Sequence, residues 1–259
     1  LGIDENIEHE NVDRSDTAPP GLQTPFAHAV LSKAAIAGKP VILVMAGIGT
    51  LAIDDLMSSS GGPAAIVEAF APGHTAGALA ESLFGVHNRW GKMPVTIYPH
   101  SYINQQPMTN YDMAVAPGRT YKYYRGRALF KFGEGLPYTN FSLTCRATDR
   151  QIALPLTASC DVTNTGNRTG DEVVMVYHVA GAAVRAVATK THPVPLRSLV
   201  GFERVTLGPG TTQTIHFRPF ERKSFELVNA DGNRTLYSGE HSLVFSRGHG
   251  AEVAINVTL

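Results

Sequence analysis

The residues of this sequence that could do chemistry gather at its start. In LGIDENIEHENVDRSD, a run of carboxylates surrounds one arginine, Arg14. The acidic residues are Asp4, Glu5, Glu8, Glu10, Asp13 and Asp16. A carboxyl group acts as a general acid when its surroundings keep it protonated until a leaving oxygen needs the proton. The alternative interpretation is a solvated acidic loop, because charge runs usually face water.

The place of this stretch in the chain favours catalysis. The three apolar residues LGI read as the end of a sheet strand, so the acidic loop would leave the carboxyl end of that strand, where open α/β sheets bind ligands. In an extended loop Glu8 and Glu10 point to opposite sides, so one can face a cleft while the other pairs inward. Asp13 and Arg14 are then the anchors of the loop.

Other motifs in the sequence give weaker evidence of function. GIGTLA at 47–52 matches the glycine pattern of a dinucleotide site, with Glu68 at about the right distance onward. Glu68 falls inside the next strand-like segment, however, so we interpret the glycines as a tight turn. The histidines and cysteines lack metal-ligand spacing, and no G-x-S-x-G nucleophile elbow occurs. We therefore predict no metal site and no cofactor.

The first part of the chain has the alternation of a layered α/β domain. Short apolar runs predict buried parallel strands at 39–47, 63–73 and 92–99. Helical spacing and an Ala-rich composition predict helices at 22–37 and 74–85, each closed by a glycine. Strands and helices in alternation indicate an α/β fold.

After about residue 140 the pattern changes to short alternating segments separated by turn clusters such as NTGNRTGD and NADGNR, which is typical of a β-sandwich. The predicted fold class is thus α/β followed by all-β. We assign residues 1–98 to an α/β domain portion and 142–259 to the sandwich. Residues 99–141, rich in Pro, Gly, Tyr and Asn, form an ordered connector.

Composition excludes several partners. The chain has 259 residues, of which 43% are hydrophobic and 17% charged, as in folded globular proteins. The 22 basic residues equal the 22 acidic ones, so no basic field attracts nucleic acid or anionic lipid. The apolar runs end short of the roughly 18 residues that a membrane helix needs. We expect neither a nucleic-acid partner nor a membrane span.

Two kinds of residue suggest an oxidising, extracellular setting. Asparagines in the N-x-S/T pattern of glycosylation sites are Asn140, Asn167, Asn233 and Asn256. Cys145 and Cys160 fit one disulfide, with a pair of buried free thiols as the open alternative. The sequence opens without Met and without a signal-peptide pattern, so we expect it to be a piece of a longer chain.

Taken together, several stretches resemble glycoside hydrolase family 3, in its β-xylosidase-like branch. They are GIDENIEHENVDR, PPGLQ, GKPVILVMAGIG, AFAPGHTAGALAESLFG, GKMPVTIYP, PGRTYKYY, FKFGEGLPYTNF, VTNTGNRTGDEVV and LVGFERVTLGPG. The resemblance implies three domains: a (β/α)8 barrel with the Asp nucleophile, an α/β sandwich domain with the Glu acid/base, and a fibronectin type III-like domain. This chain would be the C-terminal portion of the α/β sandwich domain, the connector and the fibronectin type III-like domain.

The resemblance carries the acid/base over to Glu8, with Glu10 as the reserve candidate, and matches Asp13 and Arg14 to residues that shape the loop. Retaining hydrolysis needs two carboxyl groups about 5–5.5 Å apart, so the expected partner is the N-terminal barrel of the same precursor. Substrate-binding residues are not assigned, because the barrel loops would set specificity.

The implied protein is a secreted retaining exo-β-glycosidase that acts on a xyloside, arabinoside or glucoside, as an oligosaccharide or simple glycoside. Its location would be extracellular, in the cell wall, or in a vacuole or lysosome-like compartment. The rival hypothesis is a catalytically inactive extracellular subunit with a structural or glycan-binding role. Because Glu8, Glu10, Asp13 and Arg14 are all present, the sequence favours the enzyme.

Overall fold

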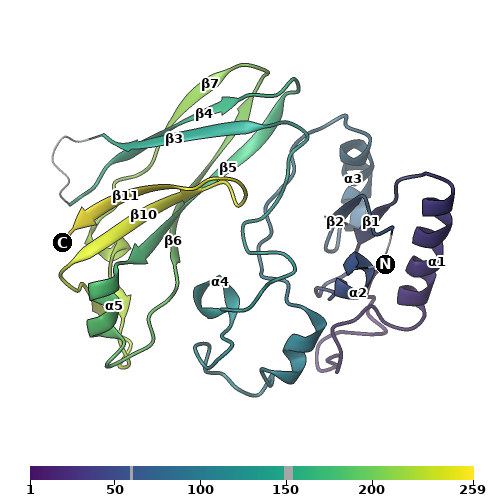
Figure 1. Ribbon diagram of the computed structural model, residues 1–259, viewed down its shortest axis with the longest axis horizontal. Coiled ribbons are helices and arrows are strands. Elements are labelled where there is room, and N and C mark those ends of the chain that lie inside the picture. The colour runs from purple at the N-terminus through teal and green to yellow at the C-terminus, as the bar shows by residue number, and fades with distance from the viewer. Residues whose placement is uncertain (59–60, 149–153) are drawn as a thin grey trace. The chain divides into compact units, whose positions relative to one another are not determined.

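A computed structural model describes residues 1–58, 61–148 and 154–259, and the chain divides into two compact units (Figure 1). Unit 1 consists of Leu1–Leu83, Thr96–Asp112 and Arg125–Phe130. Unit 2 consists of Phe84–Val95, Met113–Tyr124 and Lys131–Leu259. The segment proposed as a connector, 99–141, thus contributes residues to both units, and the three-way division of the chain stays a prediction.

Unit 1 is built on parallel strands. β1 (Ile42–Met45) pairs with β2 (Ala65–Glu68), and Gly2 forms a parallel bridge to Ala46, directly after β1. The predicted strand at 92–99 is wrong, since among the described residues it contributes only an isolated antiparallel bridge from Ile97 to Phe130. Prolines 94 and 99 interrupt this run and cannot donate to a ladder.

The described part of unit 1 contains both predicted helices, at 22–37 and 74–85, and shorter helical segments. They are α1 (Gln23–Ile36), α2 (Asp54–Ser58), the 3-10 turn η1 (Gly73–Thr75), α3 (Ala76–Leu83) and the 3-10 helix η2 (His100–Asn104). α1 ends at Ile36, and Gly38, two residues later, has a φ of 64° that suits glycine and closes the helix. Ala27 and Leu31 of α1 pack with Leu43 and Met45 of β1 in the core of the unit.

Unit 2 is an antiparallel β-sandwich. One sheet has the order β11-β10-β5-β6 and the other the order β3-β4-β7. The strands are β3 (Phe141–Ala147), β4 (Ala158–Asn164), β5 (Gly170–Ala180), β6 (Ser198–Leu207), β7 (Thr212–His216), β10 (Glu240–Ser246) and β11 (Val253–Thr258). Smaller elements are α4 (Thr120–Tyr123), α5 (Ala182–Ala188), η3 (Arg222–Ser224) and the hairpin of β8 (Leu227–Val228) and β9 (Arg234–Thr235). The predicted fold class, α/β followed by all-β, is confirmed.

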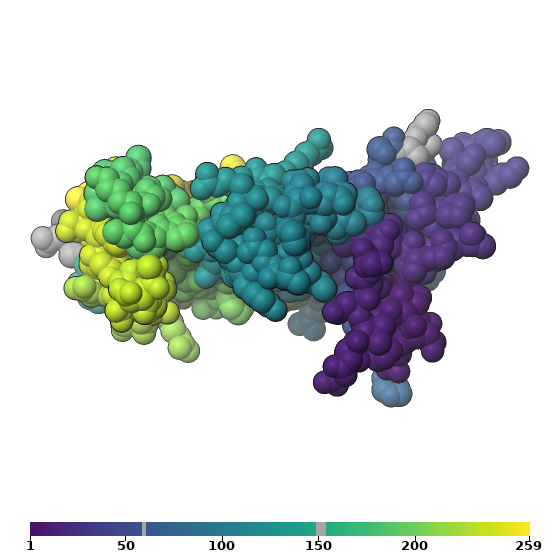
Figure 2. All heavy atoms as spheres, turned by 90° about the horizontal axis from the view of Figure 1, so that it is seen from below, coloured from purple at the N-terminus to yellow at the C-terminus, as the bar shows by residue number. Residues whose placement is uncertain are grey.

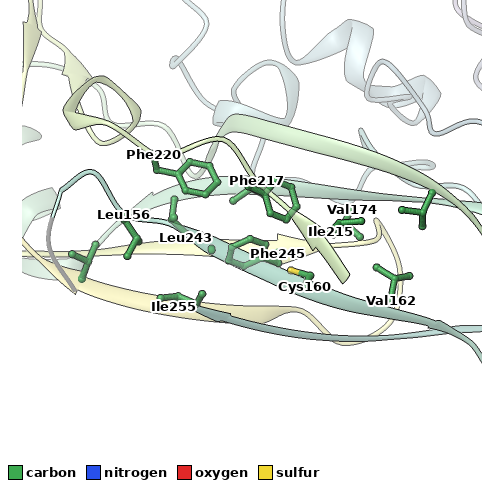
Figure 3. Packing of buried hydrophobic residues seen from close by; sticks show 14 of the residues in the cluster. Leu156, Cys160, Val162, Val174, Ile215, Phe217, Phe220, Leu243, Phe245 and Ile255 are labelled. Atoms are coloured by element: carbon green, nitrogen blue, oxygen red, sulfur yellow. The ribbon is translucent and has the colours of Figure 1, made fainter. Parts of the chain in front are cut away.

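The core of the sandwich lies between its two sheets (Figure 3). Cys160 and Val162 of β4 belong to the same buried cluster as Leu243 and Phe245 of β10 in the facing sheet, and all four are fully buried. Burial alternates along β3, β10 and β11, which explains why an alternating pattern is visible in the sequence, whereas β5 is buried along most of its length.

Cys145 and Cys160 are register partners on β3 and β4, and the structure joins their sulfur atoms at 2.03 Å in a disulfide. Both side chains belong to the inward face, with Cys160 in the core and Cys145 packed against it. The bridge therefore ties together two neighbouring strands of one sheet.

Candidate active site

The acidic loop leaves the carboxyl edge of the parallel strands of unit 1. Ile3 donates its N–H to the Ala46 carbonyl at 3.0 Å, and Ala46 donates to the Leu1 carbonyl at 2.9 Å. Residues 1–3 thus run beside the end of β1, and the loop that follows starts where β1 also ends. This edge is where open α/β sheets place their ligands. Figure 2 shows the first residues, in dark purple, on the molecular surface.

Residues 4–12 fold into two tight turns rather than the extended loop that we expected. Asp4 accepts the N–H of Asn6 through its side chain at 3.0 Å and the N–H of Glu8 through its carbonyl at 3.2 Å. His9 and Val12 then pair in an antiparallel bridge, which leaves Glu10 and Asn11 at the tip of a small hairpin. Asn11 has a φ of 70°, a conformation that asparagine tolerates in turns. The loop is therefore locally ordered by its own polar groups.

Glu8 pairs inward. Arg14 donates Nε–H to Glu8 Oε2 at 2.6 Å, and the two side chains are only 13% (Arg14) and 25% (Glu8) exposed. Arg14 also donates from Nη2 to the Thr50 carbonyl at 3.1 Å. A Cβ on Gly49 would lie 3.0 Å from Glu8 Oε2, so the bare backbone of Gly49 packs against the ion pair. We call Glu8, Arg14 and the backbone of 49–50 the clamp.

Glu10 and Asp13 lie outside the clamp. Both are exposed, and within the described part of the chain neither carboxylate makes a hydrogen bond or an ion pair. Of the four residues that the sequence singled out, the structure thus brings Glu8 and Arg14 together and leaves Glu10 and Asp13 facing solvent.

The same edge of the sheet holds another carboxylate, Glu68, which the sequence suggested only as part of a dinucleotide pattern. Glu68 ends β2, and burial raises the pKa of its carboxyl group, while the N–H that Phe70 donates at 3.1 Å lowers it in part. Its second oxygen, Oε2, is buried without a hydrogen-bond partner in the described residues. A glutamate at the end of an apolar run, as in AIVE, was the available signal.

The remaining predicted sites lie in unit 2. The four asparagines of the N-x-S/T pattern are exposed: Asn140, Asn167, Asn233 and Asn256. Within the described ranges, no group of three His, Cys, Asp or Glu residues is placed to hold a metal ion. Over the same residues, the structure contains no helix with the length and apolarity needed to cross a membrane.

Comparison with known families finds two matches along the chain. Residues 1–138 match the glycosyl hydrolase family 3 C-terminal domain, and residues 172–247 match a fibronectin type III-like domain. The first match includes the whole acidic loop and both parallel strands of unit 1. The second covers most of the sandwich.

The relatives are longer proteins. A β-D-xylosidase of Arabidopsis thaliana is 29% identical over 98% of this chain and 36% of its own length. An exo-1,4-β-xylosidase of Emericella nidulans is 31% identical over 94% of this chain and 33% of its own length. This chain therefore spans about a third of the relatives that it matches.

Solved structures are similar over nearly the whole chain. A glycoside hydrolase family 3 exo-β-xylosidase, in complex with a xylobiose aziridine probe, superposes with a TM-score of 0.82 at 28% identity, covering 99% of this chain and 35% of that one. A β-glucosidase of Erythrobacter marinus gives a TM-score of 0.72 at 30% identity, covering 96% of this chain and 31% of that one.

Proposed function

The chain belongs to glycoside hydrolase family 3, and from this premise we propose that it supplies the acid/base carboxyl group of a retaining exo-β-glycosidase. It corresponds to the C-terminal portion of β-xylosidase-like members of the family. The observation that carries the proposal is the acidic loop, which places Glu8 and Glu10 at the carboxyl edge of the parallel strands.

The proposed reaction needs two carboxyl groups. An aspartate of the upstream part attacks the anomeric carbon, while the carboxyl group of this chain gives its proton to the leaving oxygen. The same carboxylate then takes a proton from the water that cleaves the glycosyl–enzyme ester. The proposed substrates are β-xylosides, arabinosides or β-glucosides, in line with the names of the relatives and neighbours.

The proposed partner is the upstream part of the same polypeptide, since the relatives are about three times longer than this chain. α1 of unit 1 has a face for such a partner: Phe26 is 64% exposed and Ile36 82%, and Leu22, directly before the helix, is 82% exposed. Exposed apolar side chains gathered on one helix usually mark a surface that another element covers.

We also propose that the protein is secreted and carries N-linked glycans. The four N-x-S/T asparagines are exposed, and a disulfide joins Cys145 to Cys160. Both features suit an oxidising compartment. Enzymatic deglycosylation of protein secreted from a eukaryotic host should lower its apparent mass.

The test of the enzymatic proposal uses the full-length polypeptide. We expect it to hydrolyse aryl β-xylosides, with the first-formed sugar keeping the β configuration in a time-resolved NMR measurement. A variant with both Glu8→Gln and Glu10→Gln should lose about 10²–10⁴-fold in kcat/KM on substrates with poor leaving groups. If the folded full-length protein binds glycosides but hydrolyses none, the non-catalytic alternative replaces this proposal.

A further inference from the structure

The two glutamates of the loop differ in exposure and in their contacts, and this difference suits them to different roles. Glu8 is engaged by Arg14 at 2.6 Å, whereas Glu10 is exposed at the hairpin tip without a partner in the described residues. A general acid must carry a proton before the first step and must reach the leaving oxygen. Glu8 Oε2 accepts a charge-assisted hydrogen bond from Arg14, and no such contact holds the Glu10 carboxylate in the described residues.

The clamp also fixes the position of the hairpin. Glu8 directly precedes His9, which begins the hairpin, and Arg14 follows two residues after Val12, which ends it. The Glu8–Arg14 contact therefore closes the base of the hairpin on which Glu10 sits.

The clamp is tied to a second loop. Arg14 donates to the Thr50 carbonyl, and the segment 47–53 is the loop that leaves the carboxyl end of β1. Gly49 has no Cβ that would push the pair away, since an added Cβ would lie 3.2 Å from Arg14 Nη2 and 3.0 Å from Glu8 Oε2. Two loops that leave neighbouring parallel segments are thus held together by one mostly buried arginine.

We infer that Glu8 is a positioning residue, which with Arg14 clamps the 9–12 hairpin so that Glu10 at its tip donates the proton. This inference rests on the proposed glycosidase function. Glu10 gives its proton to the leaving oxygen as the bond to the anomeric carbon breaks and the carboxylate nucleophile of the upstream part forms the ester. Glu10 recovers a proton from the attacking water in the second step.

The two roles give different kinetics in the full-length enzyme. Glu10→Gln should lower kcat/KM by about 10³-fold for poor leaving groups while sparing a dinitrophenyl glycoside, remove the alkaline limb of the pH profile, and form a glycosyl azide when azide is added. Glu8→Gln should keep the alkaline limb and form no azide product. Its kcat/KM should fall by about 10–100-fold, and the fall should again be larger for poor leaving groups, because the variant misplaces only the proton donor.

A merely structural role for Glu8 would instead lower activity equally for all leaving groups. Glu8→Asp should recover part of the activity lost in Glu8→Gln. Glu5→Gln is the matched control, because Glu5 is exposed in the same loop and lies outside the clamp, so it should behave as the wild type.

Three further outcomes would overturn the inference, and they are separable from failure of the proposed function. If Glu8→Gln loses the alkaline limb and forms the azide product, Glu8 is the donor. If neither variant changes the limb in an active enzyme, the donor lies elsewhere. Amide hydrogen exchange provides a readout without catalysis: Glu8→Gln and Arg14→Lys should speed exchange at His9 and Val12, and unchanged exchange would disprove the clamp even if the full-length protein hydrolyses no glycoside.

Discussion

The sandwich of unit 2 and the parallel strands of unit 1 differ in the size of their buried cores and in the length of their strands. Among the described residues, the main buried cluster of the sandwich has 17 members and that of unit 1 has eight, although both are assembled from apolar runs of similar character. β5 of the sandwich has 11 residues, whereas β1 and β2 have four each. The core of the sandwich is therefore expected to contribute more to the stability of the chain than the core of unit 1.

The two regions also differ in where their charged and polar side chains lie. In unit 2, Lys92 pairs with the buried Glu172 at 2.7 Å; burial lowers the pKa of Lys92, and the Glu172 carboxylate opposes that shift. His178 and His241 are hydrogen-bonded to each other inside the sandwich at 2.9 Å. In unit 1, the carboxylates of the acidic loop lie at the surface edge of the strands. Within that loop Glu8 is largely covered by its ion pair with Arg14, whereas Glu10 and Asp13 face solvent.

The largest expected effect is on the sandwich core. Phe245→Ala removes a fully buried ring and should lower the free energy of unfolding by about 3–5 kcal/mol. Trp90 is the one tryptophan of the chain and belongs to unit 2, so its fluorescence during urea unfolding reports on this unit. Phe202→Ala, at a ring 64% exposed on β6, is the matched control and should cost less than about 1 kcal/mol. Equal losses would contradict a stability centred on this core.

The disulfide should have the next largest effect. Replacing both Cys145 and Cys160 with Ala opens a short loop, with a sequence separation of 15, and should cost about 3 kcal/mol in the chain-entropy description. The measurement is the same urea titration followed through Trp90. A reducing agent should shift the wild type toward the variant and leave the variant unchanged; a wild type insensitive to reduction would contradict the prediction.

Acid should weaken the sandwich through His178. Burial lowers the pKa of His178 from 6.5 to about 4, with the neighbouring His241 and Arg185 adding to the shift. Between pH 6.5 and 4 the unfolded chain therefore binds a proton at His178 that the folded chain does not bind. The contribution of the neutral histidine to the free energy of unfolding is complete above pH 6.5 and is lost as the pH falls toward 4. Between pH 8 and pH 5 the loss should be about 2 kcal/mol.

The check is the pH dependence of urea unfolding in His178→Gln, which should be flatter than that of the wild type. His216→Gln, at an exposed histidine on β7, is the control and should keep the wild-type dependence. If the two variants show the same dependence, the buried histidine is not responsible.

What the sequence could predict follows from the range of the interactions involved. α1 was predicted within one residue at each end, since its apolar spacing and Gly38 are local signals. The strand at 92–99 failed because an apolar run cannot show whether a neighbouring strand is available to pair with it. The disulfide was left open because pairing of Cys145 with Cys160 depends on the register of β3 and β4.

The acidic loop shows the same limit at the candidate site. Its residue types indicated proton transfer, and alternation along an extended loop indicated that one of Glu8 and Glu10 would pair inward. Which one does so depends on the turn at Asp4, which a side-chain hydrogen bond supports, and on the backbone pairing of His9 with Val12. No periodicity encodes either feature. The contact of Arg14 with the Thr50 carbonyl joins segments 36 residues apart and leaves no local signal.

The smallest expected effect concerns the exposed face of α1, and it tests directly how unit 1 differs from the sandwich. Phe26 of α1 is 64% exposed, so in residues 1–259 alone Phe26→Ser should change the free energy of unfolding by less than about 0.5 kcal/mol. Leu31→Ala on the buried face of the same helix is the control and should cost about 2–4 kcal/mol. Thermal unfolding followed by far-ultraviolet circular dichroism measures both.

In the full-length polypeptide the cost of Phe26→Ser should rise. If the exposed face of α1 is covered by the upstream part, Phe26 becomes buried there, and Phe26→Ser should then cost about 2 kcal/mol or more, because a polar group replaces a buried ring. A surface that stays open to water gives the same small value in both proteins, and that result would remove α1 from the proposed interface. A large loss in residues 1–259 alone would instead show that Phe26 already packs within unit 1, so that the two regions differ less than their cores indicate.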